Sequence, residues 1–175
     1  MQVSAHEELL LARCLKREPE AVSELTKTYG PPLYGFFYAA LSGHSRLARK
    51  LTPGAFARAL EETVPYQEKH IFSVNAVHRV MRDLMEHAGQ HDVPDEPASS
   101  EAVNGRLGLT LQSLWRLSPE ERIFILLRDQ LDFSMPEISF CFSIHESEAK
   151  KKLMEARLNF RRSLDIILAR KKRKR

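Results

Sequence analysis

Cysteine is scarce in this chain, with two residues among 175, Cys14 and Cys141. The two are isolated from each other, and each sits within an apolar helical pattern. Small disulfide scaffolds need more cysteines, and zinc motifs need their ligands at short, regular spacings. We therefore expect two buried free thiols in a reducing compartment.

The sequence also lacks any apolar run long enough to span a bilayer, and no charged-then-apolar leader opens it. We therefore expect a cytoplasmic protein with no membrane partner.

The motifs of common enzymes are missing as well. There is no glycine-rich phosphate loop, no nucleophile elbow and no pair of buried carboxylates. The seven histidines are scattered, and only His87 and His91, with Asp92 beside them, approach a ligand spacing. Two loose ligands are a weak metal signal. We expect no metal, no cofactor, no small-molecule substrate and no catalysis.

Positive charge is unevenly distributed. Residues 161–175 hold eight Lys/Arg and one Asp, a net +7, so a total of +4 leaves residues 1–160 at −3. Basic blocks such as 170–175 attract phosphate backbones without reading sequence. The same block is also typical of a solvated helix end, and both interpretations stay open.

Apolar residues recur with a helical period, and no strand-period segment is long enough to assign, so the sequence predicts an all-α fold. Residues 4–7 form a capping-box pattern before an apolar helix face at 9–15. Gly30-Pro31-Pro32 is expected to end the helix that starts at Pro19, and Thr52-Pro53 to start a new one. The aperiodic stretch 89–108, which contains two prolines and three glycines, reads as a flexible linker. It separates two small helical domains, residues 1–88 and 109–169, ahead of the basic tail at 170–175.

Residues 117–164 carry the clearest local signals. Ser118-Pro119-Glu120-Glu121 and Ser134-Met135-Pro136-Glu137 are both capping boxes with proline in the first turn. A turn at Ser143-Ile144 separates the second short helix from a long one. One face of that long helix is apolar, at Ala149, Leu153, Ala156, Phe160, Leu164 and Ile167. A short helix, a tight turn and a long helix with a basic outer face predict a helix-turn-helix.

This stretch resembles the C-terminal promoter-reading domain of bacterial RNA polymerase sigma factors of the extracytoplasmic-function type. The resemblance is carried in order by Leu117-Ser118-Pro119, Arg122, Leu126-Leu127-Arg128-Asp129, Ser134, Glu137-Ile138, Lys150, Leu153 and Ala156-Arg157. The opening helices also resemble that family, up to the step Tyr29, Pro31 or Pro32, and Leu33. The resemblance implies a transcription initiation factor whose partners are core RNA polymerase, promoter DNA and an anti-sigma protein.

The resemblance also implies site residues. In the long last helix, Ser147, Lys150, Lys151 and Arg157 would contact the distal promoter element. In the helix at 71–86, His78, Arg79 and Arg82 would meet the proximal element, whereas Phe72 is better placed in the core.

Three residues at the start of the long last helix depart from the family pattern. Glu146 and Glu148 in its first turn suit the helix dipole but repel DNA. His145 is a weak N-cap, so we expect the start of this helix to fray.

A larger departure lies where the family carries an acidic helix that docks on polymerase. The contact positions here are Arg49, Lys50, Leu51 and Phe56, so two cations replace carboxylates, and Pro53-Gly54 follow. Like charges across an interface oppose binding. The alternative function is therefore a sigma-like interaction protein that has lost core docking and acts as an anti-sigma-binding mimic or an adaptor. A third is a stand-alone DNA-binding regulator that uses the basic tail.

Overall fold

The computed structural model describes residues 5–61, 71–90 and 106–173, and these residues form eight helices and no strand. The helices are α1 (Ala5–Leu15), α2 (Pro19–Ala40), α3 (Ser45–Glu61), α4 (Ile71–Gln90), α5 (Arg106–Trp115), α6 (Pro119–Asp129), α7 (Met135–Phe142) and α8 (Glu146–Arg173). The predicted all-α class is confirmed for this part of the chain.

Helix α2 continues without a break through Gly30-Pro31-Pro32, so the predicted helix end there is wrong. The two prolines remove the N–H groups that would bond the carbonyls of Lys27 and Thr28. All four residues are exposed, so water can serve those carbonyls. The opposite face of the same helix buries Leu33, Phe36 and Phe37 completely, and this apolar burial outweighs the lost backbone bonds.

Helix α3 is likewise continuous across Pro53, where a new helix start was predicted. The Thr52 hydroxyl does not cap a helix; it donates to the carbonyl oxygen of Ala48 at 2.8 Å, one turn back. Pro53 itself is exposed, while Ala48, Leu51, Ala55 and Ala59 form the buried face.

Helix α4 is capped from a distance. Glu7 is buried, and its Oε1 accepts the backbone N–H of Phe72 at 3.0 Å. This first-turn amide has no partner within its own helix. Glu7 was predicted to close a capping box with Ser4, which lies outside the described residues. It also hydrogen-bonds Tyr29, whose pKa is raised by burial and by the Glu7 carboxylate.

The predicted linker is shorter than expected at both ends. Residues 89 and 90 belong to α4, and residues 106–108 belong to α5. The remaining residues of that stretch, 91–105, lie outside the described part. At the other end of the chain, residues 170–173 of the predicted tail continue α8.

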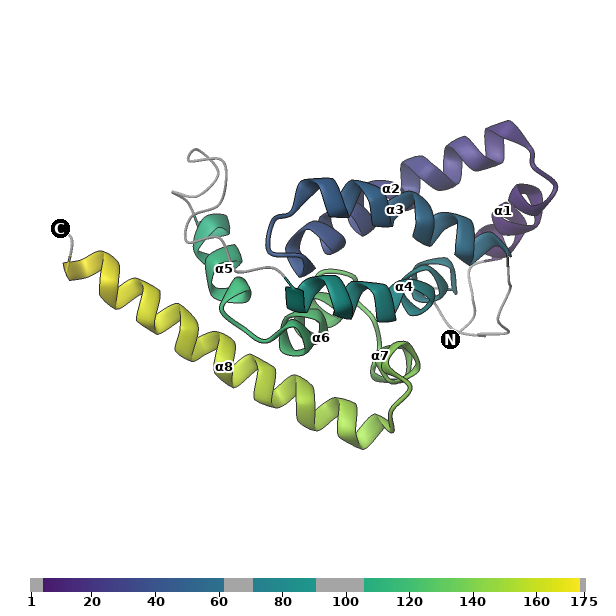
Figure 1. The fold of residues 1–175 in the computed structure, drawn as a ribbon. Helices are drawn as coiled ribbons and strands as arrows, with labels where there is room; N and C mark the ends of the chain where they lie inside the picture. Colours follow the sequence, from purple (N-terminus) through teal and green to yellow (C-terminus); the bar gives the residue numbers. More distant parts are fainter. Residues whose placement is uncertain (1–4, 62–70, 91–105, 174–175) are drawn as a thin grey trace.

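The two halves of the chain share one hydrophobic core. Helix α4 packs on α7, and α2 packs on α6 and α5, as Figure 1 shows. A single cluster of buried side chains runs through both halves. Its largest fully buried members are Trp115, Phe36, Phe37, Phe72, Phe124 and Phe133. The packing of Phe72 in this core agrees with the prediction, and both cysteines are buried free thiols.

Arg122 joins these halves through a buried guanidinium that is only 2% exposed. It donates to the carbonyl oxygen of Ala40, the last residue of α2, at 2.7 Å and to Ser42 Oγ, just past that helix, at 2.6 Å. Its other donors reach the carbonyls that end α5 and precede α6, those of Leu114, Trp115 and Leu117 at 3.1–3.4 Å. Burial lowers the pKa of Arg122 to about 10, so the side chain stays charged at neutral pH.

Trp115 adds a second link of the same kind. Its indole Nε1 donates to the carbonyl oxygen of Ala39 at 3.2 Å, beside the Arg122 contacts. Its ring also lies against Gly43, whose φ is +84°, and a Cβ added there would stand 3.0 Å from the ring. Both the turn conformation and the close approach therefore require glycine.

Replacing Arg122 with lysine is expected to destabilise the fold. Lysine has three donors instead of five, so buried carbonyls lose charged partners. We expect Arg122→Lys to lower the free energy of unfolding by about 2–4 kcal/mol, measured by urea denaturation with circular dichroism. The matched control is the exposed Arg162→Lys, which is expected to change it by about 0.5 kcal/mol or less. Equal stability of the two variants would contradict the role assigned to Arg122.

Candidate nucleic-acid interface

Helices α6 and α7 begin as the sequence predicts, with complete capping boxes. At α6, the backbone N–H of Glu121 donates to Ser118 Oγ at 3.3 Å, and the N–H of Ser118 donates to Glu121 Oε2 at 3.0 Å. At α7, Glu137 and Ser134 make the same reciprocal pair at 3.4 and 2.6 Å. Each box satisfies two backbone donors that the helix leaves open.

The turn between α7 and α8 is set by Ser143, which has a left-handed φ of 54°. The N–H of Ser143 donates to Phe140 O and that of Ile144 to Ser139 O, both at 3.1 Å. These two hydrogen bonds together form a Schellman motif. It turns the chain sharply so that α8 can cross α7.

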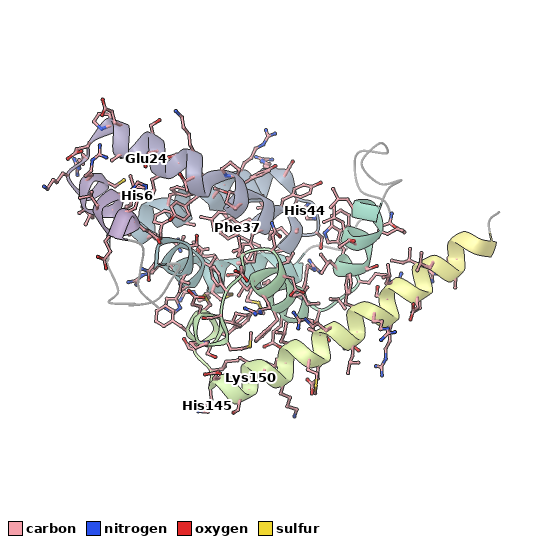
Figure 2. The ribbon with its side chains drawn as sticks, turned by 180° about the vertical axis from the view of Figure 1, so that it is seen from behind. His6, Glu24, Phe37, His44, His145 and Lys150 are labelled. Atoms are coloured by element: carbon pink, nitrogen blue, oxygen red, sulfur yellow. The ribbon has the colours of Figure 1, made fainter. Side chains whose placement is uncertain are left out.

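His145 is the N-cap of α8, and its imidazole makes cap contacts that were not predicted from the sequence. Its Nδ1 accepts the backbone N–H of Ser147 at 3.3 Å, and the same nitrogen lies 2.8 Å from Ser147 Oγ. The imidazole therefore takes the place of the hydroxyl or carboxylate that usually caps a helix. Figure 2 shows His145 and Lys150 together at this end of α8.

Helix α8 divides into an inner and an outer face. Ala149, Leu153, Ala156 and Ile167 are buried, and Phe160 and Leu164 are half-buried, as predicted. Ser147, Lys150, Lys151 and Arg157 are all exposed. Lys152 instead points at α6 and binds Glu120 Oε1 at 2.9 Å, an interaction that raises the pKa of Lys152. The choice of Lys150 and Lys151 as the outward lysines is therefore consistent with the geometry.

The outward cations have acidic neighbours. Lys150 Nζ lies 2.5 Å from Glu146, Lys151 Nζ lies 4.0 Å from Glu155, and Arg157 Nη2 lies 2.5 Å from Asp129 at the end of α6. Side chains in these pairs are 41–72% exposed. Such surface pairs contribute about 0–1 kcal/mol each, so a phosphate can replace the carboxylate at little cost.

The residues predicted to meet the proximal element are only partly accessible. The His78 ring packs on Phe140 of α7 with ring centroids 4.4 Å apart, and His78 is half-buried. Arg79 is half-buried too, and Arg82 is exposed. The α7 helix thus covers part of the α4 face that the sequence assigns to DNA.

The predicted partner-contact residues of α3 also differ in their exposure to solvent. Arg49 and Lys50 are exposed, whereas Leu51 is 9% exposed and Phe56 is half-buried with its ring centroid 4.9 Å from that of Phe72. The two apolar positions therefore contribute to the core, and the two cations are the more accessible of the four.

The side-chain contacts between α8 and α6 were not predicted from the sequence. Besides the Glu120 and Asp129 pairs, Asn159 Nδ2 donates to Glu121 Oε1 at 2.5 Å. Burial tends to raise the pKa of Glu121, but hydrogen bonds from Asn159 and Ser118 outweigh it and lower that pKa. These partners are 28 to 38 positions apart, so no local spacing signals them.

Two negative observations concern the described residues alone. The described residues contain no group of three or more His, Cys, Asp and Glu side chains that could hold a metal ion. His91 and Asp92 lie outside the described residues. No helix among them combines the length and apolarity needed to cross a membrane.

Comparisons of the sequence with models of known protein families and with curated proteins give no match.

Removing the His145 cap is expected to loosen the start of α8. We expect His145→Ala to lower the free energy of unfolding by about 1 kcal/mol and to speed hydrogen exchange of the Ser147 amide, read by NMR. His145→Asn keeps a capping oxygen and is the matched control, with near-normal stability and exchange. Unchanged exchange of the Ser147 amide in His145→Ala would contradict the assignment of His145 as the cap.

Proposed function

We propose that the chain is a divergent sigma factor that directs transcription initiation by binding RNA polymerase core and promoter DNA. The observation that supports it best is the arrangement of α6, α7 and α8, in which a short capped helix and a tight turn present the basic outer face of a longer helix. This proposal agrees with the resemblance carried by residues 117–164.

In this proposal α7 and α8 form a helix-turn-helix, with α8 as the recognition helix. Helix-turn-helix proteins contact base edges with the first residues of that helix and phosphates around them. Ser147, Lys150 and Lys151 lie in the first two turns of α8 and face outward. Arg157, two turns further on, is assigned to the phosphate backbone.

The proposal divides the chain into a domain at 1–88 and a domain at 109–169, each with its own DNA element. Because His78 packs on Phe140, use of the α4 face by DNA requires α4 and α7 to separate. The proximal contacts of His78, Arg79 and Arg82 therefore belong to an opened arrangement, whereas the α8 contacts are accessible without opening.

A second candidate function rests on α3. Arg49 and Lys50 are exposed and make no ion pair within the described part of the chain. A basic surface suits an acidic partner, and the family's polymerase site expects the opposite charge from this helix. In this alternative the chain keeps the sigma fold but binds an anti-sigma protein or another regulator without polymerase.

The deciding experiment is a pull-down of purified core RNA polymerase followed by transcription from candidate promoters. The sigma proposal expects stable association and promoter-dependent transcripts. No association with core, together with binding to an anti-sigma protein, would replace it with the alternative. If Arg49→Glu with Lys50→Asp restores core binding, only this surface has changed its partner.

DNA contact by α8 is tested with duplex binding by fluorescence anisotropy. We expect Lys150→Ala with Lys151→Ala to weaken binding and to reduce the slope of log K against log salt by about 1.8, at about 0.9 for each lost phosphate contact.

The matched control for this test is Lys16→Ala with Lys27→Ala, two exposed lysines of the N-terminal half, which should leave the slope unchanged. Binding that ignores Lys150 and Lys151 but vanishes when residues 170–175 are deleted would favour a regulator that works through its tail.

A further inference from the structure

The outer face of α8 carries a second pattern beyond its first turns. Met154, Leu158 and Leu168 are 61%, 51% and 39% exposed. Together with Arg161 and Asp165, which are also exposed, they are spaced alternately by four and three residues. This is the heptad spacing of a seam along which two helices pair. We call Met154, Leu158, Arg161, Asp165 and Leu168 the α8 seam.

Within the α8 seam, Leu158 and Asp165 lie opposite the face that packs on the rest of the molecule, whereas Arg161 and Leu168 lie nearer to that face. Successive residues of an α-helix are rotated by about 100°. The inner residues Ala156, Ser163 and Ile167 therefore project on the far side from Leu158 and Asp165. Helix α8 runs along the outside of the molecule (Figure 1), and Met154, Leu158 and Arg161 line an open groove together with Met135 of α7. A second helix would approach the seam from the solvent side of this groove.

The charges of the α8 seam are complementary to those of a second, antiparallel copy of the same seam. Arg161 and Asp165 are centred on position 163, and so are Leu158 and Leu168. Two antiparallel α8 helices can therefore be related by a two-fold axis that crosses the seam at the level of residue 163. This axis sets Arg161 of each copy against Asp165 of the other. It also sets Leu158 of each copy against Leu168 of the other. In a two-fold interface each contact occurs twice. Neither Arg161 nor Asp165 makes an ion pair within the described part of the monomer.

We propose that a second copy of this chain occupies the α8 seam, with two α8 helices paired antiparallel about Ser163 in a homodimer. This goes beyond the proposed function, which places DNA on the first two turns of the same helix. Asp165 in the middle of the seam opposes both phosphate and an acidic peptide, whereas it matches Arg161 of a second copy. One helix pair is a small interface, at or below ~1,200 Å², so the dimer belongs to the weak, transient class.

Sedimentation of the nuclease-treated full chain over a range of concentrations tests the dimer. We expect a monomer–dimer equilibrium in the micromolar range. Leu158→Asp should abolish it, with the circular dichroism spectrum and melting temperature unchanged because Leu158 is exposed. The matched control is Leu107→Asp, the same substitution at a leucine of α5 that is 65% exposed, which should leave the equilibrium as it is.

The antiparallel register has its own test. Arg161→Asp sets carboxylates against carboxylates in its homodimer, and Asp165→Arg sets guanidiniums against guanidiniums, so each variant alone should associate at least tenfold more weakly. When the two variants are mixed, each carboxylate of one chain faces a guanidinium of the other at both contacts. The mixture should therefore associate like the original chain.

Three results would overturn the proposal. They are a chain that stays monomeric at all concentrations, a dimer that survives Leu158→Asp, and variants that fail to associate when mixed. If the monomeric chain loses duplex or polymerase binding on Leu158→Asp, the seam belongs to that partner instead. None of these measurements uses polymerase or DNA to detect the dimer. Failure of the dimer proposal is therefore distinguishable from failure of the sigma proposal.

Discussion

The buried guanidinium of Arg122 is the constraint on which the arrangement of the two halves depends. A charge removed from water is costly unless its donors are satisfied, and here the acceptors are carbonyl oxygens and one hydroxyl rather than a carboxylate. Helix C-termini carry partial negative charge, and Arg122 reaches the end of α2 and the end of α5 at once. Helix α6 therefore cannot move relative to α2 without leaving that charge buried with too few acceptors.

What could be predicted from the sequence follows the range of each interaction. The capping boxes at Ser118 and Ser134 depend on residues three apart, and the inner face of α8 depends on a helical period, so both predictions were confirmed. The prolines at 31, 32 and 53 misled because local rules assign them breaks, while apolar burial on the opposite helix face decides otherwise. The Glu7 cap on α4 and the Arg157–Asp129 pair join residues far apart in the chain, and nothing local announces them.

The surfaces assigned to function differ in their accessibility. The first turns of α8 are open to solvent, whereas the α4 face lies partly under α7. Helix α8 is also long enough, at 28 residues, to carry two uses along one outer face. Its first two turns hold exposed lysines, and the later turns hold the α8 seam, in which Leu158 and Leu168 flank Arg161 and Asp165. If α8 both contacts DNA and pairs with a second copy, as we propose, DNA binding depends on protein concentration.

The buried thiol of Cys141 gives the packing of α4 on α7 a chemical readout. Its Sγ lies 3.8 Å from the carbonyl oxygen of Val74 on α4, and burial, with the nearby Glu137 carboxylate, raises the pKa of the thiol. A thiol that is both covered and protonated does not react with alkylating reagents or oxidants. Separation of α7 from α4 removes the Val74 contact of Cys141, so the rate at which this thiol is modified provides a readout of that separation.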